Sequence, residues 1–302
     1  MIAQRACRRP PLRYTRRVKP ASFDYVRART LDEALAALDA DTKILAGGQS
    51  LVPMLTMRLV RPARLVDINA IPGLDGVRAR PGGGLEIGAL TRHTDLLAAP
   101  LVQEQAPLLA AATAHVGHRA IRNRGTLGGS LAHADPAAEL PAALLALDAS
   151  VVIVGHGGRR RVALDELVVG ALTTTLAAAE ILVQVEIPDA RGTGWGFAEV
   201  ARRPGDFALA GVAAVMRATS GRCEAVRLVA FGAGDRPVRL RTAEAAIAGR
   251  PVSAELGCRA AAEVSADCRP PSDVHASAEY RTHLVGVLTE QAIGDAVGRL
   301  PG

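Results

Sequence analysis

Apolar residues in the first third of the chain recur with two periods, and each period predicts one kind of element. Leucines at helical spacing follow a capping pattern that begins at Thr30, which predicts a helix over residues 31–40. Short apolar runs that end in turn-forming residues predict strands over residues 43–46, 64–69 and 85–89. Two helices, one before and one after Pro100, should follow these strands and end near residue 115.

The middle of the chain is predicted to form a loop, a helix and a hairpin. The loop covers residues 122–130. Asp135-Pro136 is typical of a helix start, and this helix should run to about residue 146. The stretches at residues 151–154 and 159–163 flank a glycine-rich turn at residues 155–158, which predicts a hairpin.

The pattern changes near residue 190, after a predicted strand over residues 180–188. Three strand-like stretches come next, at residues 195–200, 208–216 and 226–231. Three helical stretches follow them, at residues 242–248, 254–266 and 277–300. Antiparallel strands followed by helices predict an α+β domain. We therefore expect two domains, over residues 18–190 and 191–302.

Composition narrows the possible partners. The formal charge is +6, but residues 1–17 contain six arginines and no acid, and the remaining 30 basic residues balance the 30 acidic ones. A neutral body with 3% aromatic residues argues against nucleic acid as a partner. No apolar run approaches the roughly 20 residues of a membrane span, so we expect a soluble protein. We place it in the cytoplasm, a reducing compartment that suits free thiols.

Residues 1–17 have a basic stretch without an apolar segment behind it, which disfavours an export signal. We expect a disordered tail or a misannotated start, so a chain that begins with Met in place of Val18 should fold equally well. The four cysteines, Cys7, Cys223, Cys258 and Cys268, form no C-x-x-C pair. We expect them to be free and buried, with no metal site and no disulfide framework.

Two paired-glycine stretches are the best candidates for chemistry. One is Ala46-Gly47-Gly48-Gln49-Ser50, and the other is Thr126-Leu127-Gly128-Gly129-Ser130. Such stretches leave backbone N–H groups uncovered, so two of them suit a diphosphate held from both sides. A β-branched residue in place of Gly48 or Gly128 should then meet the phosphate. Either stretch taken alone favours an ordinary tight turn, and neither matches a Rossmann or Walker pattern.

The other polar candidates are weaker. His115 and His118 lie three residues apart near a predicted helix end, where capping or packing is an alternative to ligand binding. Asp135 is either a helix cap or a partner for a ligand hydroxyl, and Glu139 lies one turn further on. We assign no catalytic residue, because no complete acid–base set is present. This suits a protein whose bound cofactor carries the reaction.

At the two glycine stretches the sequence resembles the medium, FAD-binding subunit of the xanthine dehydrogenase and carbon monoxide dehydrogenase family of molybdenum hydroxylases. The resemblance runs in order from about residue 18 to the end. It is carried by residues 43–54, 121–130, 134–136, 199–208 and 270–281. Gln49 is a difference, since carbon monoxide dehydrogenases of this family often have His there.

The resemblance implies a two-part FAD-binding domain of the vanillyl-alcohol-oxidase (PCMH) type, followed by a smaller α+β domain like that of carbon monoxide dehydrogenase flavoproteins. It implies FAD bound without a covalent bond. The implied binding residues are Leu45, Ala46, Gly47, Gly48, Gln49, Ser50, Leu51, Thr126, Leu127, Gly128, Gly129, Ser130, Asp135, Glu139 and Leu182.

The resemblance also assigns parts of FAD to these residues. The two glycine stretches would hold the diphosphate. Asp135 or Glu139 would lie near the ribityl or ribose hydroxyls, and Leu182 would touch the flavin. Residues 203–207 of the second domain would reach towards the isoalloxazine ring.

The partners that the resemblance implies are a small [2Fe-2S] subunit and a large molybdopterin subunit, assembled with this chain as a dimer of heterotrimers. Electrons would pass through the iron–sulfur subunit to FAD, and then to NAD, a quinone or oxygen. One alternative is a stand-alone flavin oxidase of the same fold, which would need a substrate pocket with a catalytic base beside the flavin. The other is a flavin-free scaffold, and the intact glycine stretches argue against it.

Overall fold

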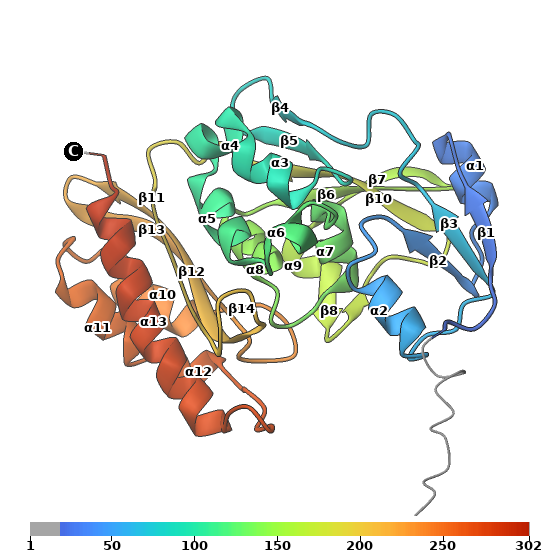
Figure 1. The fold of residues 1–302 in the computed structure, drawn as a ribbon. Helices are drawn as coiled ribbons and strands as arrows, with labels where there is room; N and C mark the ends of the chain where they lie inside the picture. The colour runs from blue at the N-terminus through green and yellow to red at the C-terminus, as the bar shows by residue number, and fades with distance from the viewer. Residues whose placement is uncertain (1–18, 302) are drawn as a thin grey trace, which may run out of the picture.

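Three larger sheets organise the chain in the computed structural model, which describes residues 19–301 (Figure 1). They are a three-stranded parallel sheet, a five-stranded antiparallel sheet and a four-stranded antiparallel sheet, in chain order of their first strands. The expected α+β class, with a two-part first domain and a C-terminal domain, is confirmed. The expectations for residues 1–17 and for Cys7 lie outside the described residues.

The parallel sheet forms one end of the molecule. Its strands are β1 (Asp24–Arg27), β3 (Arg64–Asp67) and β2 (Thr42–Leu45), with α1 (Leu31–Ala36) and α2 (Leu51–Thr56) in the connections. The capping pattern at Thr30 is confirmed, because its hydroxyl accepts a hydrogen bond from the Glu33 N–H at 3.1 Å. Helix α1 ends earlier than predicted, since the Asp39 carboxylate accepts from the Asp41 N–H and the Thr42 hydroxyl and forms a turn.

The antiparallel five-stranded sheet is the centre of the first domain. Its order is β4 (Val77–Ala79), β5 (Leu85–Gly88), β10 (Glu180–Ile187), β6 (Ser150–Gly155) and β7 (Gly158–Ala163). The predicted hairpin is β6 and β7, which pair from Ser150 with Ala163 to Gly155 with Gly158. Two smaller strands, β8 (Val168–Gly170) and β9 (Thr173–Thr174), pair with each other.

Helices cover this sheet and fill its core. They are α3 (His93–Ala98), α4 (Pro100–Gln105), α5 (Pro107–His115), α6 (Arg119–Arg122), α7 (Leu127–His133), α8 (Glu139–Ala146) and α9 (Leu164–Leu167). Three helices instead of two lie between residues 93 and 115. Pro107 disfavours a helical Ala106, whose φ is −142°, so the helix must begin again there.

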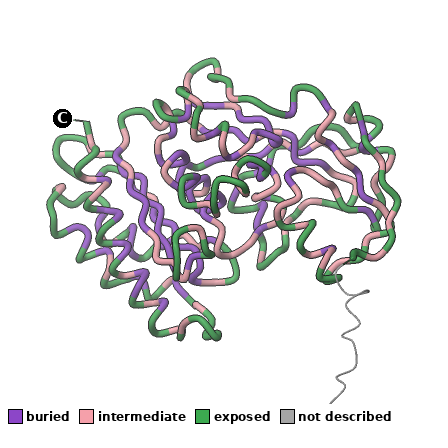
Figure 2. The backbone as a smooth tube through the Cα atoms, in the orientation of Figure 1, coloured by how far each residue is buried: buried purple, intermediate pink, exposed green. Residues whose placement is uncertain are grey.

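The four-stranded sheet packs with one face on the helices of its own domain and with the other face on the first domain. Its strands are β11 (Gly194–Ala201), β12 (Ala208–Thr219), β13 (Arg222–Phe231) and β14 (Val238–Arg239). One face packs on α10 (Arg241–Ile247), α11 (Glu255–Ala261), α12 (Val264–Asp267) and α13 (Ala278–Gly298). The other face, with Phe197 and Phe231, joins the core around α5 and α8. Figure 2 shows this continuous buried layer between the two domains.

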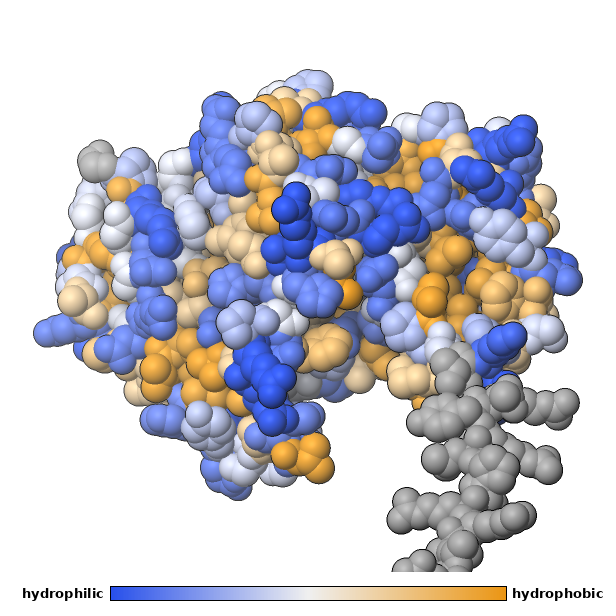
Figure 3. Space-filling view, in the orientation of Figure 1, coloured by the Kyte–Doolittle hydropathy of each residue, from blue (hydrophilic) through white to orange (hydrophobic). Residues whose placement is uncertain are grey.

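Polar and apolar side chains are interspersed over the face in Figure 3. No helix among the described residues is long and apolar enough to cross a membrane. Cys223 and Cys268 are free and buried as expected. The expectation was wrong for Cys258, which is exposed, and its thiol donates to the Glu290 carboxylate at 3.3 Å.

Candidate functional site

The two glycine stretches lie side by side although eighty residues separate them in the sequence. A Cβ built on Gly47 would lie 2.4 Å from the carbonyl oxygen of Arg124 and 2.9 Å from the Gly125 Cα. A Cβ on Gly129 would lie 3.9 Å from the Ala46 Cβ. Only glycine at position 47 permits this approach of backbone to backbone. The two stretches therefore form one continuous surface.

The first stretch presents a row of backbone donors. The N–H groups of Gly47, Gly48, Gln49 and Ser50 donate to no group within residues 19–301. Gly48 turns the chain with φ +74°, and the Gln49 side-chain amide donates to the Gly47 carbonyl at 3.2 Å. Consecutive unpaired N–H groups fit a phosphate, whose oxygens accept several hydrogen bonds at once. The residues present therefore fit the diphosphate of FAD.

The second stretch is not the loop that we predicted. Thr126 caps α7, because its hydroxyl accepts from the Gly129 N–H at 3.2 Å. The Leu127 N–H donates to the Thr91 carbonyl at 3.0 Å, and the Gly128 N–H donates to the Ala89 carbonyl at 2.8 Å. These amides are therefore used inside the protein. Unpaired donors for an anion come mainly from the first stretch.

A side chain at Gly48 or Gly128 would also meet protein atoms, and its expected contact with phosphate stays a prediction. A Cβ on Gly128 would lie 2.5 Å from the Ala89 Cβ, so this glycine lets α7 pack on the end of β5. A Cβ on Gly48 would lie 3.2 Å from side-chain atoms of Leu45 and Val52. We call the surface formed by the two glycine stretches, residues 46–50 and 126–130, the cradle. Both glycines are needed for its packing and conformation.

The remaining predicted binding residues lie around this cradle. Leu45 ends β2, Leu51 begins α2, and Ser130 lies in the middle of α7. The Asp135 carboxylate accepts from the Ala137 N–H at 2.9 Å and forms a turn, so α8 begins later than predicted, at Glu139. Leu182 is buried in the core that also contains Leu127 and Leu131 of α7. Their contacts with FAD stay predictions.

Two polar residues that the sequence reading missed join the glycine stretches. The Asn69 side-chain amide donates to the Ala46 carbonyl at 2.9 Å and to the Leu45 carbonyl at 3.3 Å. The Arg92 guanidinium donates to the Asn69 Oδ1 at 2.6 Å and also to the Arg124 carbonyl. Neither residue belongs to a recognisable motif, so the sequence carried no signal for this bridge.

A cluster of three ionisable residues, of which His115 is partly exposed, lies where the two domains meet. His115, at the end of α5, pairs through Nδ1 with the Glu199 Oε1 of β11 at 3.1 Å, and its ring contacts Phe197. Glu139 of α8 is nearby and buried. Burial raises the pKa of Glu139 to about 7, and the Glu199 hydrogen bond raises the pKa of His115. His115 thus joins the domains by an ion pair, which neither capping nor simple packing describes.

The second domain also contacts the first through residues 203–207. A Cβ on Gly205 would lie 2.8 Å from the Gly117 carbonyl oxygen, in the turn after α5. The side chain of Phe207 is 72% exposed, so it is accessible to a ligand or a partner. The predicted approach of this segment to the isoalloxazine ring stays a prediction.

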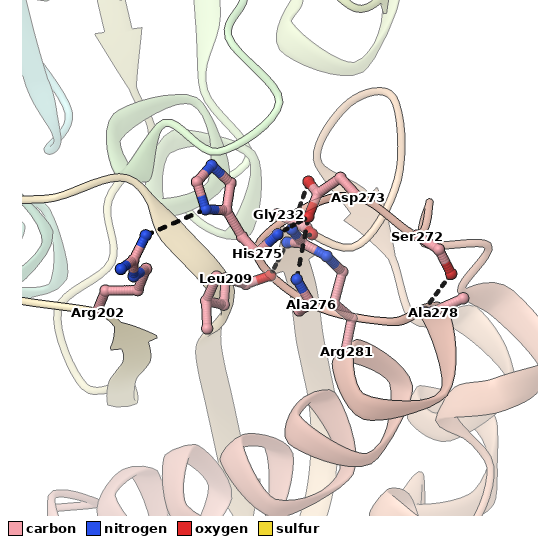
Figure 4. Close-up of polar contacts among 9 residues, drawn as sticks. All are labelled: Arg202, Leu209, Gly232, Ser272, Asp273, His275, Ala276, Ala278 and Arg281. Carbon is pink, nitrogen blue, oxygen red and sulfur yellow. Dashed lines mark hydrogen bonds and ion pairs between the residues drawn. The ribbon is translucent and has the colours of Figure 1, made fainter.

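The motif at residues 270–281 lies against the chain on either side of residues 203–207 (Figure 4). The buried Arg281 of α13 donates to the carbonyls of Leu209 and Gly232, and pairs with the Asp273 carboxylate at 2.8 Å. Arg202 lies 3.4 Å from the His275 ring nitrogen. The motifs at residues 199–208 and 270–281 are therefore in direct contact.

We expect the cluster at the domain boundary to make the chain less stable as pH rises. The raised pKa of Glu139 contributes stability that is fully present below its usual 4.5 and is lost as pH rises through about 7. The raised pKa of His115 contributes stability that is lost above its usual 6.5. A loss of about 2 kcal/mol would lower Tm by roughly 4–8 °C in a chain of this size.

Melting curves between pH 5 and pH 8 measure this dependence. Glu139→Gln should reduce the fall of Tm between about pH 5 and pH 7. His115→Gln should reduce the fall of Tm at higher pH. A Tm of the unsubstituted chain that stays constant or rises over this range would contradict the assignment of these protons.

Family models match nearly all of the described chain. The FAD binding domain in molybdopterin dehydrogenase matches residues 21–190, and the CO dehydrogenase flavoprotein C-terminal domain matches residues 195–296. The 6-hydroxypseudooxynicotine dehydrogenase complex subunit alpha of Paenarthrobacter nicotinovorans is 40% identical, over 93% of this chain and 97% of that protein. The carbon monoxide dehydrogenase medium chain of Hydrogenophaga pseudoflava is 36% identical, over 93% and 99% respectively.

Solved structures agree with the sequence comparisons. Carbon monoxide dehydrogenase from Hydrogenophaga pseudoflava superposes with a TM-score of 0.90 at 37% identity, covering 93% of this chain and 99% of that one. Quinoline 2-oxidoreductase from Pseudomonas putida 86 superposes with a TM-score of 0.88 at 37% identity, covering 93% and 98%. These matches define an FAD-binding oxidoreductase subunit. The chain belongs to the xanthine dehydrogenase and carbon monoxide dehydrogenase family, as a medium subunit, which confirms the resemblance.

Proposed function

We propose that this chain relays electrons within a heteromeric molybdenum hydroxylase. It would take them from a [2Fe-2S] subunit and pass them to an external acceptor, namely NAD, a quinone or oxygen. The observation that supports the site is the row of unpaired N–H groups at residues 47–50, directly beside the start of α7. The printed names of relatives, which are medium chains or subunits of dehydrogenase complexes, support the assembly.

Each part of the cradle has a role in this proposal. The N–H groups of residues 47–50 donate hydrogen bonds to the diphosphate oxygens, and the hydroxyls of Thr126 and Ser130 lie beside the diphosphate. The carboxylate of Asp135 or Glu139 accepts a hydrogen bond from the ribityl or ribose hydroxyls, and Leu182 contacts the flavin. FAD, once bound, accepts electrons singly and passes them on as a pair. The protein positions it and excludes water.

The proposed assembly contains a small [2Fe-2S] subunit and a large molybdopterin subunit, as a dimer of heterotrimers. Residues 18–190 would form the FAD-binding domain. Residues 191–302 would form the domain that covers the flavin, with residues 203–207 as the segment that approaches it. The contact of Gly205 with the turn after α5 supports this placement.

Purified full-length chain tests the flavin assignment directly. We expect an absorbance band near 450 nm, and acid precipitation should release the yellow colour into the supernatant because FAD is held without a covalent bond. Colour that stays in the pellet would contradict non-covalent binding. A colourless chain that takes up no added FAD would favour the flavin-free scaffold.

A further inference from the structure

The bridge between Asn69 and Arg92 connects the two halves of the cradle. On one side, Asn69 donates to the carbonyls of Leu45 and Ala46, directly before the unpaired N–H groups. On the other side, Arg92 donates to the Arg124 carbonyl, the same oxygen against which Gly47 packs. Since Arg92 also donates to the Asn69 Oδ1 at 2.6 Å, one chain of hydrogen bonds spans both glycine stretches.

Both ends of this bridge are held by neighbouring structure. The Asn69 amide nitrogen also donates to the Asp67 Oδ1 at 2.6 Å, and the Tyr25 hydroxyl donates to the Asp67 Oδ2 at 2.5 Å. These bonds orient the amide so that its oxygen faces Arg92. The backbone at Arg92 forms a bridge with Thr126, and the His93 N–H donates to the Gly125 carbonyl at 3.0 Å. A shift of either stretch must therefore break the bridge.

The bridge also brings positive charge to a cradle that contains no lysine. Arg92 donates to neutral oxygens and forms no ion pair within the described residues. The Arg124 guanidinium has no hydrogen-bond or ion-pair partner among residues 19–301. Burial and the nearby Arg124 charge lower the pKa of Arg92, and the carboxylates of Asp95, Asp67 and Asp75 oppose this shift only in part. An anion close to these two groups would relieve their repulsion.

We propose that Arg92 is a positioning residue for FAD, which works through Asn69 and through its charge. With Asn69 it sets the spacing between the two glycine stretches, so that the N–H groups at residues 47–50 face one diphosphate. Its charge, with that of Arg124, attracts the diphosphate. This inference rests on the FAD site of the proposed function.

Equilibrium dialysis of the full chain against FAD and against ADP, each over a range of NaCl concentrations, tests both parts. We expect Arg92→Met to raise the Kd of FAD and of ADP at least about tenfold, and to weaken the dependence of both Kd values on salt. Arg92→Lys should keep the salt dependence, because it keeps the charge. It should still raise Kd, because an ammonium group does not reproduce the two-acceptor fork. Asn69→Ala should raise Kd with unchanged salt dependence.

Arg64→Met is the matched control. Arg64 also donates to a backbone carbonyl, that of Ala37, and begins β3, the strand that precedes Asn69, but its partners lie outside the glycine stretches. Its FAD Kd should stay within about twofold of the unsubstituted chain. Circular dichroism of each FAD-free variant separates lost binding from lost folding. If Arg92→Met does not fold, Arg92→Lys and Asn69→Ala carry the test.

Three outcomes would overturn the inference. The first is an unchanged FAD Kd in Arg92→Met, or in both Arg92→Lys and Asn69→Ala. The second is a loss of FAD affinity without a matching loss of ADP affinity, which would place the effect away from the diphosphate. The third is a salt dependence that Arg92→Met leaves intact. Failure of the unsubstituted chain to bind FAD would instead overturn the FAD site itself.

Discussion

A single methyl group at position 47 should separate the two halves of the cradle and cost this chain its flavin. In Gly47→Ala the new Cβ would lie 2.4 Å from a backbone oxygen and 2.9 Å from a backbone carbon. Neither atom belongs to a side chain that can rotate away, so a whole stretch must move. We expect the FAD Kd to rise more than tenfold and overpacking to destabilise the folded state by about 1–3 kcal/mol.

The neighbouring glycines should respond differently, because each is needed for its own reason. Gly128→Ala places its Cβ against Ala89 beneath α7. It should therefore lower Tm clearly, while its FAD Kd rises less than that of Gly47→Ala. Gly48→Ala meets only side-chain atoms at 3.2 Å, but it must keep φ +74°. That conformation costs about 1–2 kcal/mol for a residue with a Cβ.

Gly157→Ala is the matched control for these variants. Gly157 lies in the turn between β6 and β7, and a Cβ there has nothing within 4 Å. Its Tm and FAD Kd should equal those of the unsubstituted chain. Fluorescence titration with FAD and thermal melting measure both quantities. A Gly47→Ala chain with an FAD Kd within twofold of the Gly157→Ala control would contradict the loop contact as a determinant of the site.

Elements that depend on local patterns were predictable from the sequence. The hairpin of β6 and β7 follows from two strand-like stretches around a glycine turn, and the cap at Thr30 follows from residues three positions apart. Three strands of the C-terminal sheet, β11, β12 and β13, were also predicted, whereas the two-residue strand β14 was missed. In each case the interacting residues are close in the chain.

The second glycine stretch shows where local reading fails. Paired glycines are poor helix formers, so Gly128 and Gly129 predicted a loop, yet they lie in the first turn of α7. The Thr126 cap and the contact of Gly128 with Ala89 outweigh the low propensity. The partner of Gly128 lies in a different strand region, and nothing in the local sequence indicates it.

Polar pairs between distant segments were missed for the same reason. Asn69 and Arg92 lie 23 residues apart, and His115 lies 84 residues before Glu199. Each is an isolated polar residue in the sequence, without the spacing that marks a motif. Only the fold brings them together, so the sequence identified the cradle but missed the bridge that holds it and the ion pair across the domains.

The FAD-loaded chain alone should leave organic substrates of the molybdenum hydroxylase class unoxidised. In the proposed relay, oxidation of the substrate takes place on the large subunit, and this chain only receives electrons. The cradle is the proposed cofactor site, and three polar groups near it or at the domain boundary, Asn69, Arg92 and the His115–Glu199 pair, already bind protein groups. We expect bleaching near 450 nm by substrate only after both partner subunits are added.

Co-expression with candidate small iron–sulfur and large molybdenum subunits tests this expectation. Size-exclusion chromatography should show one complex, and its Tm should exceed that of the isolated chain because binding to the folded state stabilises it. Substrate-dependent dye reduction should appear with the Gly157→Ala chain and fall with Gly47→Ala, which should carry little FAD. Rapid flavin reduction by the isolated chain would refute the relay and favour a stand-alone oxidase. A stable monomer that binds neither partner would lead to the same conclusion.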